Sequence, residues 1–154
     1  MDTFSPLNGH VPDFDPRPVS PGEYPVWDEA LAVVNRDLAA ALPEQGDLRL
    51  IALPSWEEGE PENVYVALPD GRWHGNELGN DSAATPLDAL ITVAEAAQET
   101  VIECLWRVWP VCTEHDLGMH PREEDGRPVW WCAGGGRSGG PAHVGAALGE
   151  LDAL

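Results

Sequence analysis

The sequence predicts a small α+β domain in which two amphipathic helices pack on one face of a three-stranded antiparallel sheet. Two long segments repeat apolar residues with the period of an α-helix, and three short apolar runs bounded by turn residues lie between them. A chain of 154 residues is long enough to bury one hydrophobic core. We therefore expect the order helix, three-stranded meander, long helix, followed by a C-terminal hairpin appendix and a short final helix.

The two helices are expected at residues 27–42 and 86–106. In the first segment the apolar residues fall on one stripe, the polar residues, Asp37 included, lie mostly off it, and Pro43 ends the helix. The second segment begins with a Thr-Pro pair at residues 85 and 86, where threonine can cap the helix and proline suits its first turn.

The three strands are expected at residues 48–53, 63–68 and 72–78. The Pro-Asp-Gly sequence at residues 69–71 favours a tight turn, because proline presets φ and glycine permits a positive φ. The last two strands are therefore expected to form a hairpin.

The chain divides into three segments by composition. Residues 1–25 are rich in proline and are expected to be an irregular tail. Residues 26–108 contain the predicted α-βββ-α core, and residues 109–154 form an appendix rich in Cys, His and Trp. The appendix contains a glycine-rich loop, and a short helix is expected at about 141–151.

The charge of the chain limits its partners. The net charge is −19, from 27 acidic and 8 basic residues, so the surface repels nucleic-acid phosphates and attracts basic proteins. Glu95, Glu99 and Glu103 recur at every fourth position on the exposed face of the second helix. They are either a docking surface for a basic protein partner or a solvated face.

The sequence favours a cytoplasmic protein with no membrane association. It has no apolar run of about 20 residues, the length that a membrane helix requires. The first residues have no basic segment typical of a secretion signal, and the 3 cysteines cannot all pair within one chain.

The reactive side chains cluster in the C-terminal third. Cys112 and His115 are separated by two residues, a spacing that lets both side chains reach one ion, and His120 follows at a suitable interval. A short hairpin turning at Gly126 would bring Cys132 to the same point. We expect these two cysteines and two histidines to bind one structural Zn²⁺, with His143 as the alternative to His120.

The pattern Trp109-Pro110-x-Cys112-x-x-His115, followed by His120-Pro121 and by Val129-Trp130-x-Cys132, resembles the C-terminal region of small uncharacterised proteins from high-GC actinobacteria. The resemblance covers roughly residues 87–132 and implies a metal site at the same Cys and His positions, but no activity.

The function expected from these features is binding and not catalysis. The acidic residues form no recognisable catalytic pair, and the glycine-rich loop matches no phosphate-binding motif. The chain is therefore predicted to be an acidic partner-binding protein of the adaptor, chaperone or immunity type. The alternative is a metal-dependent hydrolase with an open zinc site.

Overall fold

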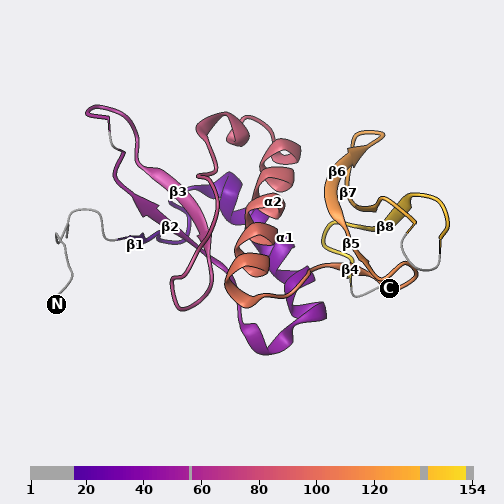
Figure 1. The fold of residues 1–154 in the computed structure, drawn as a ribbon. Helices are drawn as coiled ribbons and strands as arrows, with labels where there is room; N and C mark the ends of the chain where they lie inside the picture. The colour runs from indigo at the N-terminus through magenta and orange to yellow at the C-terminus, as the bar shows by residue number, and fades with distance from the viewer. Residues whose placement is uncertain (1–15, 56, 136–138, 152–154) are drawn as a thin grey trace.

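The computed structural model describes residues 16–55, 57–135 and 139–151, and it confirms an α+β fold. Two helices lie between an N-terminal three-stranded sheet and a group of C-terminal strands (Figure 1). Helix α2 contacts strand β3 of the first sheet on one side and strands β6 and β7 on the other. The buried side chains of all three layers form one hydrophobic cluster.

Both predicted helices are confirmed. Helix α1 spans Pro25–Ala41, two residues earlier than its apolar stripe, and a 3-10 turn at Pro43–Gln45 (η2) follows it. Helix α2 spans Pro86–Leu105, and its cap is the one expected, because the Thr85 hydroxyl accepts a hydrogen bond of 3.0 Å from the backbone N–H of Asp88.

The first sheet has the strand order β1-β2-β3 and is antiparallel throughout. Strands β2 (Arg49–Leu53) and β3 (Asn63–Ala67) lie where the sequence predicted them. The third strand is β1, Arg17–Pro18, which pairs with β2 and comes from the segment expected to be an irregular tail. Residues 1–15 of that tail lie outside the described residues.

The strand predicted at residues 72–78 is wrong, because this segment forms an isolated bridge with β3 at Ala67 and Trp73 instead of a continuous ladder. It meets β3 again where the Leu78 N–H donates to the Val64 carbonyl at 2.8 Å. The backbone N–H of His74 donates to the Thr100 hydroxyl on α2 at 3.2 Å, and the same hydroxyl donates to the Val66 carbonyl of β3 at 2.8 Å. Buried Thr100 therefore holds both β3 and the backbone at His74 against α2. A 3-10 turn at Asn80–Ala83 (η3) leads into the helix.

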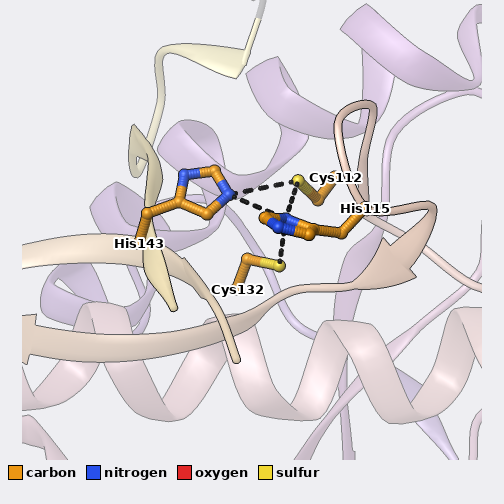
Figure 2. A group of neighbouring side chains, drawn as sticks. All are labelled: Cys112, His115, Cys132 and His143. Carbon is orange, nitrogen blue, oxygen red and sulfur yellow. Dashed lines mark hydrogen bonds between the residues drawn. The ribbon is translucent and has the colours of Figure 1, made fainter. Parts of the chain in front are cut away.

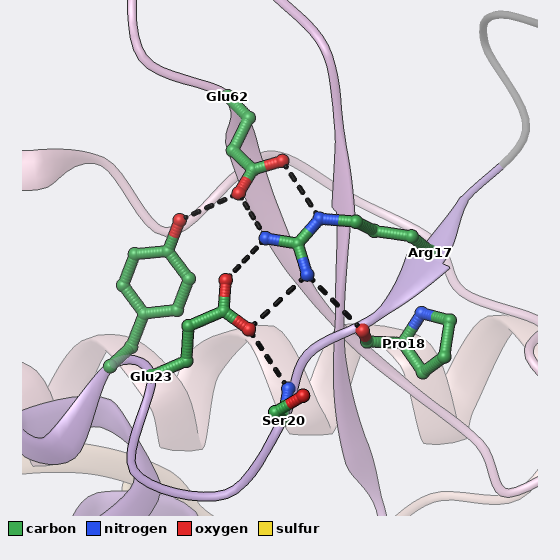
Figure 3. A network of polar contacts seen from close by, with 6 residues as sticks. Arg17, Pro18, Ser20, Glu23 and Glu62 are labelled. Carbon is green, nitrogen blue, oxygen red and sulfur yellow. Dashed lines mark hydrogen bonds and ion pairs between the residues drawn. The ribbon is translucent and has the colours of Figure 1, made fainter.

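An arginine side chain fixes β1 beside the start of β3 (Figure 3). The Arg17 guanidinium forms ion pairs with Glu23 and Glu62, and the Tyr24 hydroxyl donates to Glu62 at 2.9 Å. Hydrogen bonds from Arg17 are the largest cause that lowers the pKa of each of these two carboxyl groups. The short strand thus depends on side-chain contacts as well as on its few backbone hydrogen bonds.

Two small antiparallel sheets form the C-terminal part. Strands β4 (Val111–Cys112) and β5 (Leu117–Gly118) form a hairpin. Strands β6 (His120–Glu124), β7 (Arg127–Cys132) and β8 (His143–Ala147) form a sheet in that order. The expected hairpin appendix is therefore present.

The predicted final helix is wrong, since residues 143–147 form β8 and pair with β7. Glycine is a poor helix residue, and Gly145 is also required by packing, because a Cβ there would lie 2.3 Å from Met119 Sδ. Pairing with β7 and contact with Met119 outweigh the helix propensity of the neighbouring alanines.

A buried carboxylate joins the first helix to the C-terminal strands. Asp37 of α1 is 0% exposed and accepts hydrogen bonds from Trp130 Nε1 at 2.7 Å, the Gly149 N–H at 2.7 Å and the Leu151 N–H at 3.0 Å. The apolar pattern of α1 did not predict that Asp37 would be a buried hydrogen-bond acceptor. Asp37 replaces solvent as the acceptor for three buried donors and links α1 to the C-terminal end of the described chain.

Candidate metal centre

The β4–β5 hairpin brings two reactive side chains together. Cys112 ends β4, and the turn after it contains His115. The turn closes through a 2.7 Å hydrogen bond from the Asp116 N–H to the Cys112 carbonyl, with Asp116 at a φ of 58°. Aspartate tolerates this left-handed conformation better than most residues, so the sequence suits the turn.

The β7–β8 pair supplies the other two side chains. Cys132 and His143 are direct partners in the antiparallel register, and directly opposed residues project from the same face of a sheet. The glycine-rich connection folds back on itself, with the Gly135 N–H donating to the Gly140 carbonyl at 2.9 Å. A Cβ at Gly134 would lie 2.5 Å from the backbone nitrogen of Ala142, so this close return needs glycine.

The four donor atoms from the two hairpins converge within 4.8 Å of one another (Figure 2). Cys112 Sγ lies 3.6 Å from His115 Nδ1 and 3.3 Å from His143 Nε2. His115 Nδ1 lies 3.5 Å from Cys132 Sγ and 3.2 Å from His143 Nε2. Tetrahedral zinc with ordinary bond lengths separates its ligands by about 3.6 Å for S–N and about 3.3 Å for N–N pairs. The group is therefore compact enough to hold one metal ion.

The surroundings of the cluster orient its ligands. Cys112, His115 and Cys132 are buried and His143 is half-buried. His143 Nδ1 lies 3.2 Å from the Val144 carbonyl, so donation to this oxygen would leave Nε2 unprotonated toward the cluster. The Gly134 N–H donates to Cys132 Sγ at 3.4 Å, and a Cβ at Gly140 would lie 2.8 Å from His115 Nε2. Gly134 and Gly140 therefore lie close against the site.

The electrostatic environment favours one thiolate. Burial raises the pKa of Cys112, but hydrogen bonds from the backbone and side chain of His115, and from His143, lower it in sum to about 6. Burial is the main cause that raises the pKa of Cys132. The hydrogen bond to Cys112 is the main cause that raises the pKa of His143. A cation at this point would stabilise both thiolates.

His143, the alternative fourth residue, lies in the cluster, and His120, the preferred one, does not. His120 is opposite Trp131 in the β6–β7 register, one position before Cys132 along β7. Because successive side chains of a strand point to opposite faces, His120 and Cys132 project to different sides of the sheet. Cys104 is half-buried on α2, outside the cluster.

The three glutamates proposed for partner binding lie exposed on α2. The Glu99 carboxylate lies 3.1 Å from His74 Nδ1, and the Glu103 carboxylate lies 4.0 Å from Nε2 of the same ring. The segment after β3 therefore contacts part of this acidic ridge, while Glu95 is further along it toward the start of α2.

Sequence reasoning missed the contribution of the glycine-rich loop. Gly134 and Gly140 have φ values of +78° and +104°, and both lie where a side chain would collide with the site or its supporting loop. The signal was the concentration of glycines between Cys132 and His143. Such a run can close a tight loop as well as provide flexibility.

Comparison with known proteins finds no match among protein-family models, curated proteins or solved structures. Within residues 16–55, 57–135 and 139–151, no helix has the length and apolar character needed to cross a membrane.

Proposed function

We propose that Cys112, His115, Cys132 and His143 bind one Zn²⁺ ion in a closed structural site, in an acidic protein that binds a basic protein partner without catalysis. The observation that supports the metal site best is the convergence of its four donor atoms, which all lie within 4.8 Å of one another. Four of the distances between them are 3.2 to 3.6 Å, close to those of a tetrahedral zinc site.

The donor set favours zinc over other common metals. Two thiolates and two imidazoles are soft and borderline ligands, whereas Mg²⁺ and Ca²⁺ prefer carboxylate and carbonyl oxygens. Tetrahedral coordination by two sulfur and two nitrogen atoms is typical of zinc in structural sites.

The position of the four residues favours a structural role. Cys112 and His115 belong to the β4–β5 hairpin, and Cys132 and His143 belong to the β7–β8 pair. One ion would cross-link the two small sheets to which these hairpins belong. In zinc-finger peptides such binding contributes about 10–16 kcal/mol, which acts as folding free energy.

The metal-dependent hydrolase remains the second candidate, and one observation favours it. His143 is the least buried of the four residues and follows the glycine-rich loop. If it left the ion, three protein ligands and a water would remain, as catalytic zinc requires. Four converging donors leave no position for that water, which is why we prefer the structural site.

The partner-binding part of the proposal is based on charge. A net charge of −19 on 154 residues creates a field that attracts basic proteins and speeds their association. The predicted consequence is binding that weakens with added salt, because screening acts over about 8 Å at physiological ionic strength.

The metal site is tested by measuring zinc per chain after purification, together with the visible spectrum of the Co²⁺-substituted protein. We expect one metal per chain and a spectrum of a tetrahedral site with thiolate ligands. X-ray absorption should show two sulfur ligands and two imidazoles for the structural site. The hydrolase site would show two sulfur ligands, one imidazole and one oxygen, a difference that appears in the multiple scattering from the imidazole rings.

Matched variants make the test specific to these four residues. Cys112→Ser, Cys132→Ser and His143→Ala should lose or weaken metal binding, whereas Cys104→Ser and His120→Ala should keep it. Wild-type protein that binds no stoichiometric metal, or metal binding that depends on His120 and not on His143, would refute the proposed site.

A further inference from the structure

A groove lies between α2 and the β4–β5 hairpin, and none of the four residues of the metal site lines it. It has a volume of about 560 Å³, and Ile102, Val108 and Leu117 give it an apolar lining. Glu95, Glu99 and His120 lie along the same groove. The fold thus places aliphatic side chains next to carboxylates, a combination that suits a ligand with both apolar and cationic groups.

The apolar part of the groove is exposed beyond what the fold requires. Val108 is 59% exposed, and Trp106, between Ile102 and Val108 in the chain, is 89% exposed at the end of α2. Val108 lies against Gly118, because a Cβ added at Gly118 would be only 2.9 Å from Val108 Cγ1. Large exposed side chains at a positioned site are typical of a contact surface for another protein.

The carboxylate of Glu95 lines the groove and is the one that a cationic partner group would pair with. Partial burial is the one identified cause that raises the pKa of Glu95, and no basic side chain pairs with it in the part of the chain that the structure describes. Its neighbour Glu99, by contrast, contacts His74. A partly desolvated carboxylate without a cation gains from a partner's guanidinium or ammonium group.

We propose that this groove binds a basic segment of a protein partner, one in which an aliphatic or aromatic side chain enters between Ile102, Val108 and Leu117 while an adjacent arginine or lysine pairs with Glu95. This inference rests on the proposed partner-binding function and specifies where and by which chemistry the partner is held.

Charge complementarity favours this occupant over a second copy of the chain. Two copies would each bring a net charge of −19, and like charges oppose their association. A basic segment instead neutralises the glutamates along the groove and covers the exposed apolar side chains in the same step.

The experiment uses the full zinc-containing protein and a phage-displayed library of random dodecapeptides. Peptides selected on the wild-type protein should be enriched in arginine or lysine next to leucine, isoleucine or tryptophan. A labelled peptide with the consensus sequence then serves as the probe, and its affinity and association rate are measured by fluorescence anisotropy and stopped flow at several salt concentrations.

Two groove variants and two matched controls locate the binding site. Val108→Ser should weaken binding by at least about fivefold, which corresponds to the loss of an important contact side chain. Glu95→Gln should do the same mainly through slower association, and less so at high salt. Ala40→Ser changes another exposed apolar side chain and Glu29→Gln another exposed acid, both on α1, and neither should change binding. Zinc content should be unchanged in all four variants.

The outcomes separate this inference from the proposed function. If basic peptides bind with salt dependence but the groove variants bind as tightly as wild type, the groove is the wrong surface and partner binding by charge stands. If no basic peptide is enriched, both the groove and the charge-based function are wrong. Concentration-dependent dimerisation that Val108→Ser abolishes would identify a second copy as the occupant and overturn the proposal.

Discussion

Replacing Asp37 by alanine should destabilise the protein more than any other single substitution of a polar residue on α1. The carboxylate is fully buried and accepts three hydrogen bonds, from Trp130 Nε1 and from the N–H groups of Gly149 and Leu151. Alanine removes both oxygens and leaves three buried donors without an acceptor. The loss therefore exceeds that of one ordinary hydrogen bond.

The magnitude follows from the bonds that each substitution removes. Hydrogen bonds to a charged group contribute about 1.5–3 kcal/mol each but do not add fully, so we expect Asp37→Ala to cost about 3–5 kcal/mol. Asp37→Asn keeps one oxygen, which can accept from Trp130 and Gly149 as Oδ2 does now. Its amide group would face the Leu151 N–H, so one donor is orphaned at a cost of about 1–3 kcal/mol.

The assay is urea unfolding at a fixed zinc concentration, followed by hydrogen exchange to locate the change. Exchange should increase at β7 and at Gly149 and Leu151, where the lost partners lie. Glu29→Ala is the matched control, because it removes an exposed carboxylate from the same helix. An Asp37→Ala protein within about 1 kcal/mol of wild type, or no less stable than the control, would refute this account of the buried carboxylate.

Three further predictions concern the loop over the metal site, the sheet and its arginine. Gly140→Ala should weaken zinc affinity, measured by competition with a chelator, more than Gly135→Ala does. Both glycines have a positive φ, but only a Cβ at Gly140 would lie 2.8 Å from His115 Nε2. Equal losses of affinity would implicate backbone strain alone. Thr100→Val should cost about 1–3 kcal/mol in urea unfolding, because the buried Val66 carbonyl and the part-buried His74 N–H lose their partner. A smaller change would show that water replaces the hydroxyl. Arg17→Gln should raise the pKa of Glu62 toward its ordinary value of 4.5, as measured by carbon NMR titration. Because folding lowers the pKa of Glu62, its contribution to stability is present at neutral pH and is lost as the pH falls through the lowered value. If Glu62 titrates in the variant as it does in the wild type, the ion pair with Arg17 is contradicted.

The parts of the fold that the sequence predicted depend on local patterns. Helices α1 and α2 and strands β2 and β3 have periodic apolar residues, caps and turns within their own segments. Strand β1 has only two residues, and it forms because Arg17 meets glutamates elsewhere in the chain. No periodicity can be seen in so short a segment.

The segments that were wrongly predicted are decided by tertiary contacts. Residues 72–78 have a strand-like composition, but Thr100 on α2 captures their backbone at His74. Residues 141–151 contain alanines that favour a helix, but Gly145 fits against Met119 and the segment pairs with β7. These competing contacts join residues distant in sequence and have no signature within either segment.

The candidate metal site could be predicted in residue type and mostly in position. The Cys-x-x-His spacing brings Cys112 and His115 together through one turn, which is a local property. The choice between His120 and His143 depended on which residue lies directly opposite Cys132 in the sheet. That residue is His143 of β8, and the sequence did not predict β8 as a strand, so its register with β7 could not be derived.

The hydrogen bonds of Asp37 also have a consequence for the order of folding. Its three donors come 93, 112 and 114 residues later in the chain. Contacts of such separation form slowly, because a long loop must close before they stabilise the structure. While the chain is being synthesised, the face of α1 that carries Asp37 cannot dehydrate until residues 130–151 have emerged. The packing of α1 can therefore be completed only after synthesis has passed that point, and during this interval chaperones would find an exposed helix face.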